Sequence, residues 1–345
     1  MSDDARHPIL DVTGLRVRFD RDEGVVRAVN GADFRLPPGG SIGIVGESGC
    51  GKTISAYAVL RILPRTGRIA SGRVRFRKAD DSVVDLAHLA PNSREMRRIR
   101  GGDIAMIFQE PMTAFSPVHT ICNQIAEGIR LHRGLDKDAA RRRVVELLGL
   151  VGIPDPARRA ESYPFQLSGG MRQRAMIAMA LACSPRVLIA DEPTTALDVT
   201  IQAQVLRLIK DMQAEFGLSL ILITHDLAVV AHMVDHVYVM YLGRVVEEGP
   251  VEVIFDEPRH PYTRALLRSI PRLTAGKRKL EPIEGSVPDP YTLPPGCAFH
   301  PRCRQRVGAI CAAKVPAPTR VGPDHCASCF LYDDAESDDD ADDAG

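Results

Sequence analysis

A glycine-rich loop near the start of the chain has the residue types and spacing of a phosphate-binding site. The loop contains Gly46, Glu47, Ser48, Gly49, Cys50, Gly51, Lys52 and Thr53, and it matches the pattern G-x-x-x-x-G-K-[ST] at every fixed position. Glycines let such a loop curl so that backbone N–H groups point at phosphate oxygens, and the helix that follows adds partial positive charge. We expect Lys52 to neutralise the β- and γ-phosphates of a nucleotide and Thr53 to bind Mg²⁺.

The segments on either side of the loop support this interpretation. Residues 41–45 form a short β-branched run, and residues 52–63 are apolar at helical spacing until Pro64 ends the pattern. Strand, loop and helix therefore follow one another in the order that the phosphate motif requires. The alternative, a glycine-rich turn with an incidental Lys-Thr pair, does not account for both flanking elements.

Two adjacent carboxylates follow a second apolar strand. Residues 187–190 are Val-Leu-Ile-Ala, and Asp191 and Glu192 come directly after them. Ligands of open α/β sheets bind at the carboxyl ends of the strands. We therefore expect Asp191 to hold Mg²⁺ and Glu192 to polarise a water molecule for attack on the γ-phosphate. Asp-Glu-Pro alone is equally compatible with a plain turn, and only the phosphate loop favours a site.

Three further polar positions fit a nucleotide site. Ser168, Gly169 and Gly170 lead directly into a predicted helix and so form a second anion-binding helix terminus. Gln109 and His225 each follow a predicted strand. A single Gln or His at such a place is more often a structural polar group than a ligand. Here Gln109, Ser168 and His225 occur along the chain in the order expected of one nucleotide site, which favours ligands.

The elements that position these residues predict an α/β fold with two layers of different kinds. Strands are expected at 15–19, 24–34, 73–77 and 83–85, and they form a small antiparallel layer with 15–19 at its edge. Residues 93–167 read as a helical insertion. Buried strands at 187–190 and 218–224 alternate with helices, which predicts a parallel sheet covered on both faces.

Composition limits the class of protein. The chain has 345 residues, enough for two domains, and its 44 basic and 44 acidic residues give no reason to expect a nucleic-acid partner. We find no run long enough to span a membrane and no signal peptide, so we expect a cytosolic protein. The acidic end, residues 333–345, is predicted to be a disordered tail.

Cysteines crowd into the last part of the chain. Cys297, Cys303, Cys311 and Cys329 offer thiolates for an iron–sulfur cluster or a tetrahedral zinc, and Cys326 is expected to be an extra thiol. This segment is rich in Pro and poor in apolar runs, so a metal would supply a constraint that burial does not. Their spacings are wider than the CxxC pairs typical of structural zinc. Uncoordinated thiols are the third alternative.

Together these motifs resemble those of the ATP-binding cassette (ABC) ATPases. The loop at Gly46 is similar to Walker A, Gln109 to the Q-loop glutamine, the Ser168 motif to the signature, Asp191 and Glu192 to Walker B, Ala196 to Asp198 to the D-loop, and His225 to the switch histidine. The resemblance implies that Glu192, His225 and Gln109 act in catalysis. It also implies that Thr53, Gln109 and Asp191 bind Mg²⁺, that Asp198 lies at the nucleotide and that Phe19 stacks on adenine.

The motif variants, and the run from His260 to Leu267, resemble the ATPase subunits of dipeptide and oligopeptide importers. This resemblance implies a nucleotide-binding domain at 1–255, a helical subdomain at about 93–167 and an extension at 256–332 that carries a [4Fe–4S] cluster. It implies a translocase at the cytoplasmic face of the inner membrane. Its partners would be a second, similar ATPase or a copy of this chain, two membrane permeases and an extracytoplasmic solute-binding protein. A nickel or other small-solute importer is an alternative, and a soluble ABC ATPase a further one.

Overall fold

The computed structural model describes residues 7–110, 114–195, 197–269 and 283–333. The chain forms two compact units. The first is built mainly from Arg75–Ile223, and the second from Asp11–Arg35, Ile42–Val74 and the described residues from Thr224 onward. The predicted acidic tail lies outside the described residues from residue 334 to the end of the chain.

The first unit has three parallel strands with helices around them. Strand β7 lies between β6 and β8, and the register pairs Ile107 with Ala190 and Asp191 with Ile223. Every residue of these strands is buried, as the continuous apolar runs predict. The elements are β5 (Val83–Asp85), η2 (Leu86–His88), α2 (Arg94–Gly102), β6 (Ile104–Ile107), α4 (Ile121–Arg133), α5 (Lys137–Leu150), α6 (Pro156–Ala160), η3 (Pro164–Gln166), α7 (Gly169–Leu181), β7 (Val187–Asp191), α8 (Val199–Phe216) and β8 (Ser219–Ile223).

Side-chain caps set where the longer helices of this unit begin. The side chains of Thr120, Asp136, Ser168 and Asp198 each accept a hydrogen bond from a backbone N–H in the first turn of the helix that follows. Such a cap satisfies a donor that has no partner within the helix, which stabilises the helix by about 1 kcal/mol. Residue types at these positions therefore fix the starts of α4, α5, α7 and α8.

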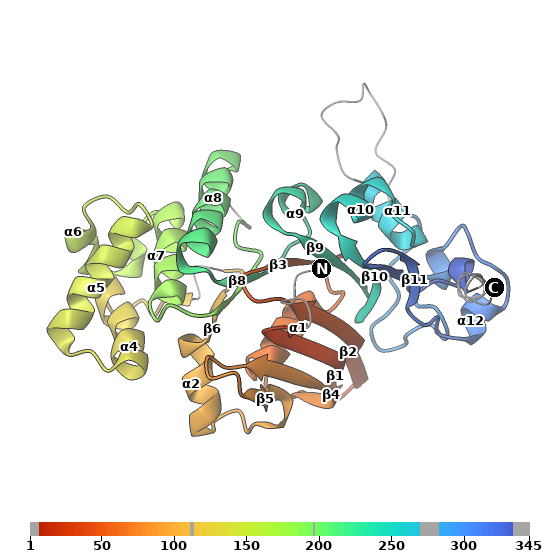
Figure 1. Cartoon of the computed structure of the whole chain (residues 1–345), viewed down its shortest axis with the longest axis horizontal. Helices are drawn as coiled ribbons and strands as arrows, with labels where there is room; N and C mark the ends of the chain where they lie inside the picture. The colour runs from red at the N-terminus through yellow and green to blue at the C-terminus, as the bar shows by residue number, and fades with distance from the viewer. Residues whose placement is uncertain (1–6, 111–113, 196, 270–282, 334–345) are drawn as a thin grey trace, which may run out of the picture. The chain divides into compact units, whose positions relative to one another are not determined.

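The predicted helical insertion at 93–167 differs from the structure in one element. Its range includes strand β6, which pairs in parallel with β7, so the segment is helical only before and after residues 104–107. Helices α4, α5, α6 and α7 then group together (Figure 1). Pro156 begins α6, because proline is tolerated at the first helical position.

The second unit contains an antiparallel layer and part of a mixed sheet. Strand β1 lies between β2 and β4 and is therefore not the edge strand that its alternating pattern suggested. In the mixed sheet the order is β3, β9, β10, β12, β11, with β3 parallel to β9 and the others antiparallel. The elements are β1 (Leu10–Arg21), β2 (Gly24–Leu36), β3 (Ser41–Val45), α1 (Lys52–Val59), β4 (Gly67–Arg77), α9 (Leu227–Met233), β9 (His236–Tyr241), β10 (Arg244–Pro250), α10 (Val251–Asp256), α11 (Pro261–Arg268), η4 (His300–Arg302), α12 (Ile310–Ala313), β11 (Thr319–Gly322), β12 (His325–Ala327) and η5 (Phe330–Tyr332).

The C-terminal segment is tied to this unit by backbone pairing. Strand β12 pairs with β10, with Glu247 opposite Ala327 and Glu248 opposite Cys326. The segment therefore extends a sheet that also contains β3, the strand that leads into the phosphate loop. This pairing supplies a constraint that the short apolar runs of the segment do not.

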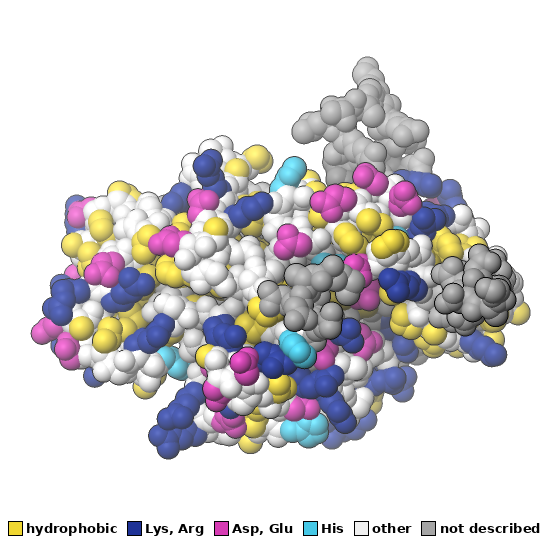
Figure 2. All heavy atoms as spheres, in the orientation of Figure 1, with side chains coloured by type: hydrophobic (Ala, Val, Ile, Leu, Met, Phe, Trp, Pro, Cys, Tyr) yellow, Lys and Arg dark blue, Asp and Glu magenta, His cyan; other side chains and the backbone are white. Residues whose placement is uncertain are grey.

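The surface drawn in Figure 2 has no large region of a single charge. Basic and acidic side chains are interspersed over the antiparallel strands on this face. No helix in the described part of the chain combines the length and the apolar character that crossing a lipid bilayer requires.

Candidate functional site

The phosphate loop begins and ends at glycines that no other residue could replace without a shift in the backbone. Gly46 has φ 149°, and a Cβ atom there would lie 2.2 Å from the carbonyl oxygen of Met240. Gly51 has φ 104°, and its Cβ would lie 2.3 Å from the carbonyl oxygen of Ala28. The loop therefore passes close to two neighbouring strands, with the curl that its glycines predict.

Lys52 and Thr53 open helix α1 directly after this loop. The Lys52 Nζ donates to the carbonyl oxygens of Gly46 and Glu47, at 2.8 and 3.1 Å, and the side chain is buried. Thr53 is half-buried. Burial raises the pKa of the Cys50 thiol, and the nearby Lys52 lowers it by less. The loop thus contains a neutral thiol and a lysine amine that contacts the backbone of the loop itself.

The Walker B residues lie where the sequence predicts, at the end of a buried strand in the first unit. Asp191 is fully buried as the last residue of β7. Glu192 follows with φ 45°, a left-handed conformation that is unusual for glutamate, and its N–H donates to the carbonyl of Ile223 at 2.8 Å. Such backbone strain is typical of functional positions.

Gln109 and Glu192 are in contact, although 83 positions separate them in the chain. The Gln109 Nε2 donates to the Glu192 Oε2 at 2.9 Å, and the Thr195 hydroxyl donates to the same oxygen at 2.9 Å. Sequence reasoning missed Thr195. Its position three residues after Glu192, in a Pro-Thr-Thr turn, was the signal available for it.

The signature and D-loop residues begin two helices of the same unit. The Ser168 hydroxyl accepts from the Met171 N–H at 3.3 Å and caps α7, and Gly169 and Gly170 form the first turn of that helix. Asp198 caps α8 by accepting from the Ile201 N–H at 3.0 Å. Ser168, Gly169 and Asp198 are exposed, and Ala196 lies outside the described residues. The predicted helix start at Ser168 is therefore confirmed, and binding of an anion there stays a prediction.

His225 and Phe19 belong to the second unit and differ in exposure. His225 is exposed directly after Thr224, as a residue that contacts a ligand would be. Phe19 is only 6% exposed, and its ring packs so closely on Gly67 that a Cβ there would lie 2.6 Å from it. The ring therefore lies in the core of this unit, and its stacking on adenine stays a prediction.

The four predicted cysteine ligands share one local environment. Burial raises the pKa of the Cys297 thiol, and that of Cys329 to about 11. Electrostatic interactions link Cys329 to the other three thiols. Among the described residues, however, no three His, Cys, Asp or Glu side chains are grouped as ligands of one metal ion.

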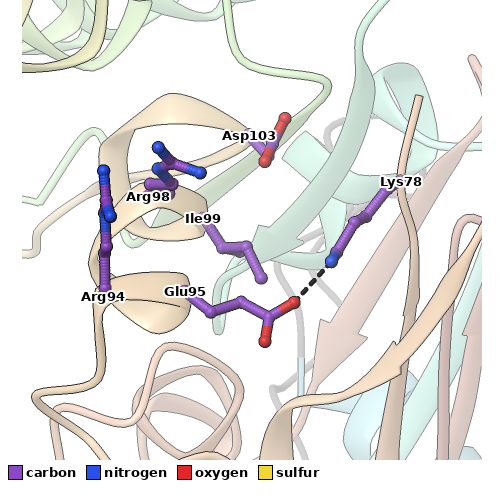
Figure 3. A pocket seen from close by; sticks show the side chains of 6 residues that line it. All are labelled: Lys78, Arg94, Glu95, Arg98, Ile99 and Asp103. Atoms are coloured by element: carbon purple, nitrogen blue, oxygen red, sulfur yellow. Dashed lines mark hydrogen bonds and ion pairs between the residues drawn. The ribbon is translucent and has the colours of Figure 1, made fainter. Parts of the chain in front are cut away.

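A pocket in the first unit lies apart from these residues (Figure 3). Its volume is about 370 Å³, and an ion pair between Lys78 and Glu95 crosses it. Burial raises the pKa of Asp103 at its wall, which Arg186 and Lys78 partly oppose. None of the predicted nucleotide residues lines it, so it is not the candidate ATP site. The lining side chains are Lys78, Arg94, Glu95, Arg98, Ile99 and Asp103.

Comparison with known proteins decides the family. Residues 29–195 match the family model described as "ABC transporter", and residues 246–311 match "Oligopeptide/dipeptide transporter, C-terminal region". Over 335 residues the chain is 51% identical to a Brucella ovis protein whose name describes it as a peptide import ATP-binding protein. The match covers 95% of this chain and 98% of that protein. The chain belongs to the ABC transporter ATP-binding family.

Other relatives of this ABC ATPase match over similar lengths. The dipeptide transport ATP-binding protein of Bacillus subtilis is 48% identical over 326 residues, covering 94% of this chain and 95% of that protein. Among solved structures, the dimeric ATP-binding cassette MJ0796, bound to ADP and Pi, has a TM-score of 0.61 at 25% identity. The match covers 70% of this chain and 98% of the MJ0796 chain. The predicted ABC ATPase fold is therefore confirmed.

Proposed function

We propose that this ABC ATPase hydrolyses ATP to power the import of di- and oligopeptides through partner permeases. The observation that carries the substrate class is the match of residues 246–311 to the C-terminal region of oligopeptide and dipeptide transporters. Relatives named for peptide or dipeptide transport match almost the whole chain, the C-terminal segment included. The chain would act at the cytoplasmic face of the inner membrane, bound to two permease subunits.

The residues of the site would act as follows. Lys52 and the loop amides would bind the β- and γ-phosphates, and Glu192 would polarise the attacking water while Gln109 and Thr195 hold its carboxylate. Oxygen ligands suit Mg²⁺, so Thr53, Asp191 and Gln109 would hold the ion, which neutralises phosphate charge when bound. His225 would contact a γ-phosphate oxygen.

The family resemblance adds a second ATPase subunit to this proposal. Ser168 and Asp198 would face the nucleotide held by the phosphate loop of that subunit, either a similar chain or a second copy. An extracytoplasmic solute-binding protein would then supply the specificity for peptides. Because the ATPase itself touches no peptide in this scheme, the partners decide what is transported.

Replacing Lys52 with Ala should weaken ATP binding by about tenfold or more, since a charged hydrogen bond to phosphate is lost. Titration of the purified chain with a fluorescent ATP analogue in the presence of Mg²⁺ measures this. Lys210→Ala, on the outer part of helix α8, is the matched control and should bind as the wild type does. Equal affinity in the Lys52 variant would contradict the assignment of the loop.

Peptide import is tested in cells that carry the chain with its neighbouring permease and binding-protein genes. Uptake of a labelled dipeptide should depend on the chain and should be lost with Lys52→Ala. Uptake of labelled nickel in the same cells tests the alternative substrate. Nickel uptake that depends on Lys52, with dipeptide uptake unchanged, would overturn the proposal for peptides.

For the cysteine-rich segment we propose a [4Fe–4S] cluster held by Cys297, Cys303, Cys311 and Cys329. The support is the donor set of four thiols, with Cys329 in electrostatic contact with the other three. A cluster spans more space than a single ion, so its ligands need not converge on one point. Bound there, it would supply a structural cross-link rather than chemistry on ATP.

Iron and acid-labile sulfide measured on anaerobically purified protein should each approach four per chain, with visible absorption that Cys303→Ser removes. Cys326→Ser is the matched control, because Cys326 lies on β12 and is not among the proposed ligands. Stoichiometric zinc without iron would contradict the cluster and favour a zinc site.

A further inference from the structure

A buried arginine in the C-terminal segment forms a two-pronged ion pair with the phosphate loop, within the second unit. The Arg302 Nη1 and Nη2 donate to the two carboxylate oxygens of Glu47, at 2.7 and 3.1 Å. The Arg302 side chain is only 4% exposed and that of Glu47 23%. Glu47 is the second residue of the loop, directly after Gly46. A bidentate, poorly hydrated pair of this kind fixes both distance and orientation.

Arg302 itself is held on several sides. Its guanidinium lies 5.9 Å from the ring centroid of Tyr241 and 6.0 Å from that of Phe299, and its Nε donates to the carbonyl of Glu284 at 3.0 Å. Its Nη1 also donates to the Tyr241 hydroxyl at 3.3 Å. The position of the guanidinium is therefore fixed.

The same segment of sequence holds the main chain of the loop. The Glu47 N–H donates to the Tyr262 hydroxyl at 2.9 Å. Tyr262 is fully buried, and its ring packs on Tyr241 and Phe299, with centroids 4.6 and 5.4 Å apart. Glu47 is thus held by its backbone from α11 and by its carboxylate from η4, and one aromatic cluster supports both contacts.

Arg302 is also locked to the cysteine-rich turn. It ends η4, in which the His300 N–H donates to the carbonyl of Cys297 at 2.9 Å and the Cys303 N–H donates to the carbonyl of His300 at 3.3 Å. Backbone hydrogen bonds therefore connect Arg302, and through it Glu47, to the turn that contains Cys297 and Cys303.

We propose that Arg302 is a positioning residue for nucleotide binding: by holding Glu47, it makes the affinity of the phosphate loop for ATP depend on the C-terminal segment. The proposal rests on the proposed binding of ATP at this loop. Arg302 acts in two ways. It fixes the curl of the loop, and it neutralises a carboxylate that would otherwise repel the phosphates of the nucleotide.

Removing the guanidinium should therefore weaken ATP binding without affecting the chemical step. Arg302→Gln should raise the Kd for Mg·ATP about tenfold and raise the KM of the ATPase reaction, with kcat within about twofold of the wild type. Arg302→Lys should recover part of the affinity, since it keeps the charge and loses the bidentate geometry. Arg304→Gln is the matched control: Arg304 lies two residues away and forms an exposed ion pair with Glu284, so its loss should leave Kd and KM unchanged.

A second variant separates repulsion from a general loss of structure. Once Arg302 is replaced, the Glu47 charge opposes ATP, so Arg302→Gln combined with Glu47→Gln should bind ATP more tightly than Arg302→Gln alone. A merely structural role predicts no such recovery, because the ion pair is already broken in Arg302→Gln and the second change removes nothing further from it. Tyr262→Phe, which removes only the acceptor of the Glu47 N–H, should weaken binding by about fivefold and serves if Arg302→Gln unfolds.

Each outcome of the titrations has one meaning. If Arg302→Gln and Tyr262→Phe both bind ATP with the Kd of the wild type, the positioning role is overturned and the assignment of the ATP site stands. Absence of ATP binding by the wild-type chain overturns the proposed function instead. Weaker binding by Arg304→Gln that equals the effect at Arg302 would also overturn the proposal, since it would show that any change in the segment acts alike.

Discussion

Replacing Glu192 with Gln is expected to reduce ATP hydrolysis by a factor of about 100 or more, the usual contribution of a general base. Gln keeps the size of the side chain and can still contact Gln109 and Thr195, but it cannot accept a proton from the attacking water. ATP binding should stay within about twofold of the wild type. Phosphate release measures the first effect, and titration with an ATP analogue measures the second.

The geometry around Glu192 supplies a graded control. Thr195 donates to the same carboxylate oxygen as Gln109, so Thr195→Val removes one positioning hydrogen bond and leaves the base in place. We expect a loss of about tenfold or less, the effect of one hydrogen bond to a charged group. In Glu192→Gln, ATP should also persist in a closed dimer, visible as a larger species by size-exclusion chromatography. Wild-type turnover by Glu192→Gln would refute its role as the base.

The sequence predicts the local parts of this site well. Asp191 and Glu192 follow a buried strand, Ser168 and Asp198 cap helices, and Gly46 and Gly51 take conformations that only glycine adopts easily. Each of these features depends on neighbours within a few positions. Residue type and spacing along the chain therefore suffice to predict them.

What the sequence does not predict are contacts that depend on strand order or on distant segments. Gln109 meets Glu192 because β6 lies beside β7 in parallel, so that Ile107 and Ala190 are paired and both polar side chains follow at one edge. A strand before Gln109 is predicted, but no periodicity reveals which strands are its neighbours in the sheet. Arg302 lies 255 positions from Glu47, beyond any local pattern.

The same limit applies to Phe19. A single aromatic residue at the expected place favours a stacking role, yet alternation in β1 is equally typical of a strand with one buried face. Leu15, Val17 and Phe19 are buried at alternate positions, so they share that face. The ring of Phe19 packs on Gly67.

A buried carboxylate joins the C-terminal segment to the rest of the second unit. Glu247 on β10 is 1% exposed, and its Oε1 lies 2.8 Å from the His325 Nε2 on β12. Its two oxygens also accept from the backbone N–H groups of Arg259 and His260, at 2.6 and 2.9 Å. Burial alone would raise the pKa of Glu247, but these donors, His325 first, outweigh it and hold the pKa below its usual range.

We therefore expect Glu247→Gln to lower the free energy of unfolding by about 3 kcal/mol at neutral pH, because an amide cannot serve this set of donors. Chemical denaturation followed by circular dichroism measures the effect. Its neighbour provides the control. Burial raises the pKa of Glu248, so its charge costs stability, and Glu248→Gln should leave the unfolding free energy unchanged or increase it. Equal losses in both variants would contradict the role assigned to Glu247.

The dependence on pH separates Glu247 from the buried histidines near it. Burial lowers the pKa values of His236 and His260 to about 4, so the unfolded chain takes up protons first, and stability falls as the pH drops from about 6.5 to 4. The wild type and Glu247→Gln share this loss. The depressed pKa of Glu247 contributes stability at every pH above the pKa of a glutamate in the unfolded chain, about 4.3. This contribution is lost as the pH falls through the pKa of Glu247 in the folded chain. The difference in unfolding free energy between the wild type and Glu247→Gln should therefore be constant from pH 8 to about 5 and decrease only below about pH 4. If that difference disappeared between pH 7 and 5, the effect would belong to a histidine instead.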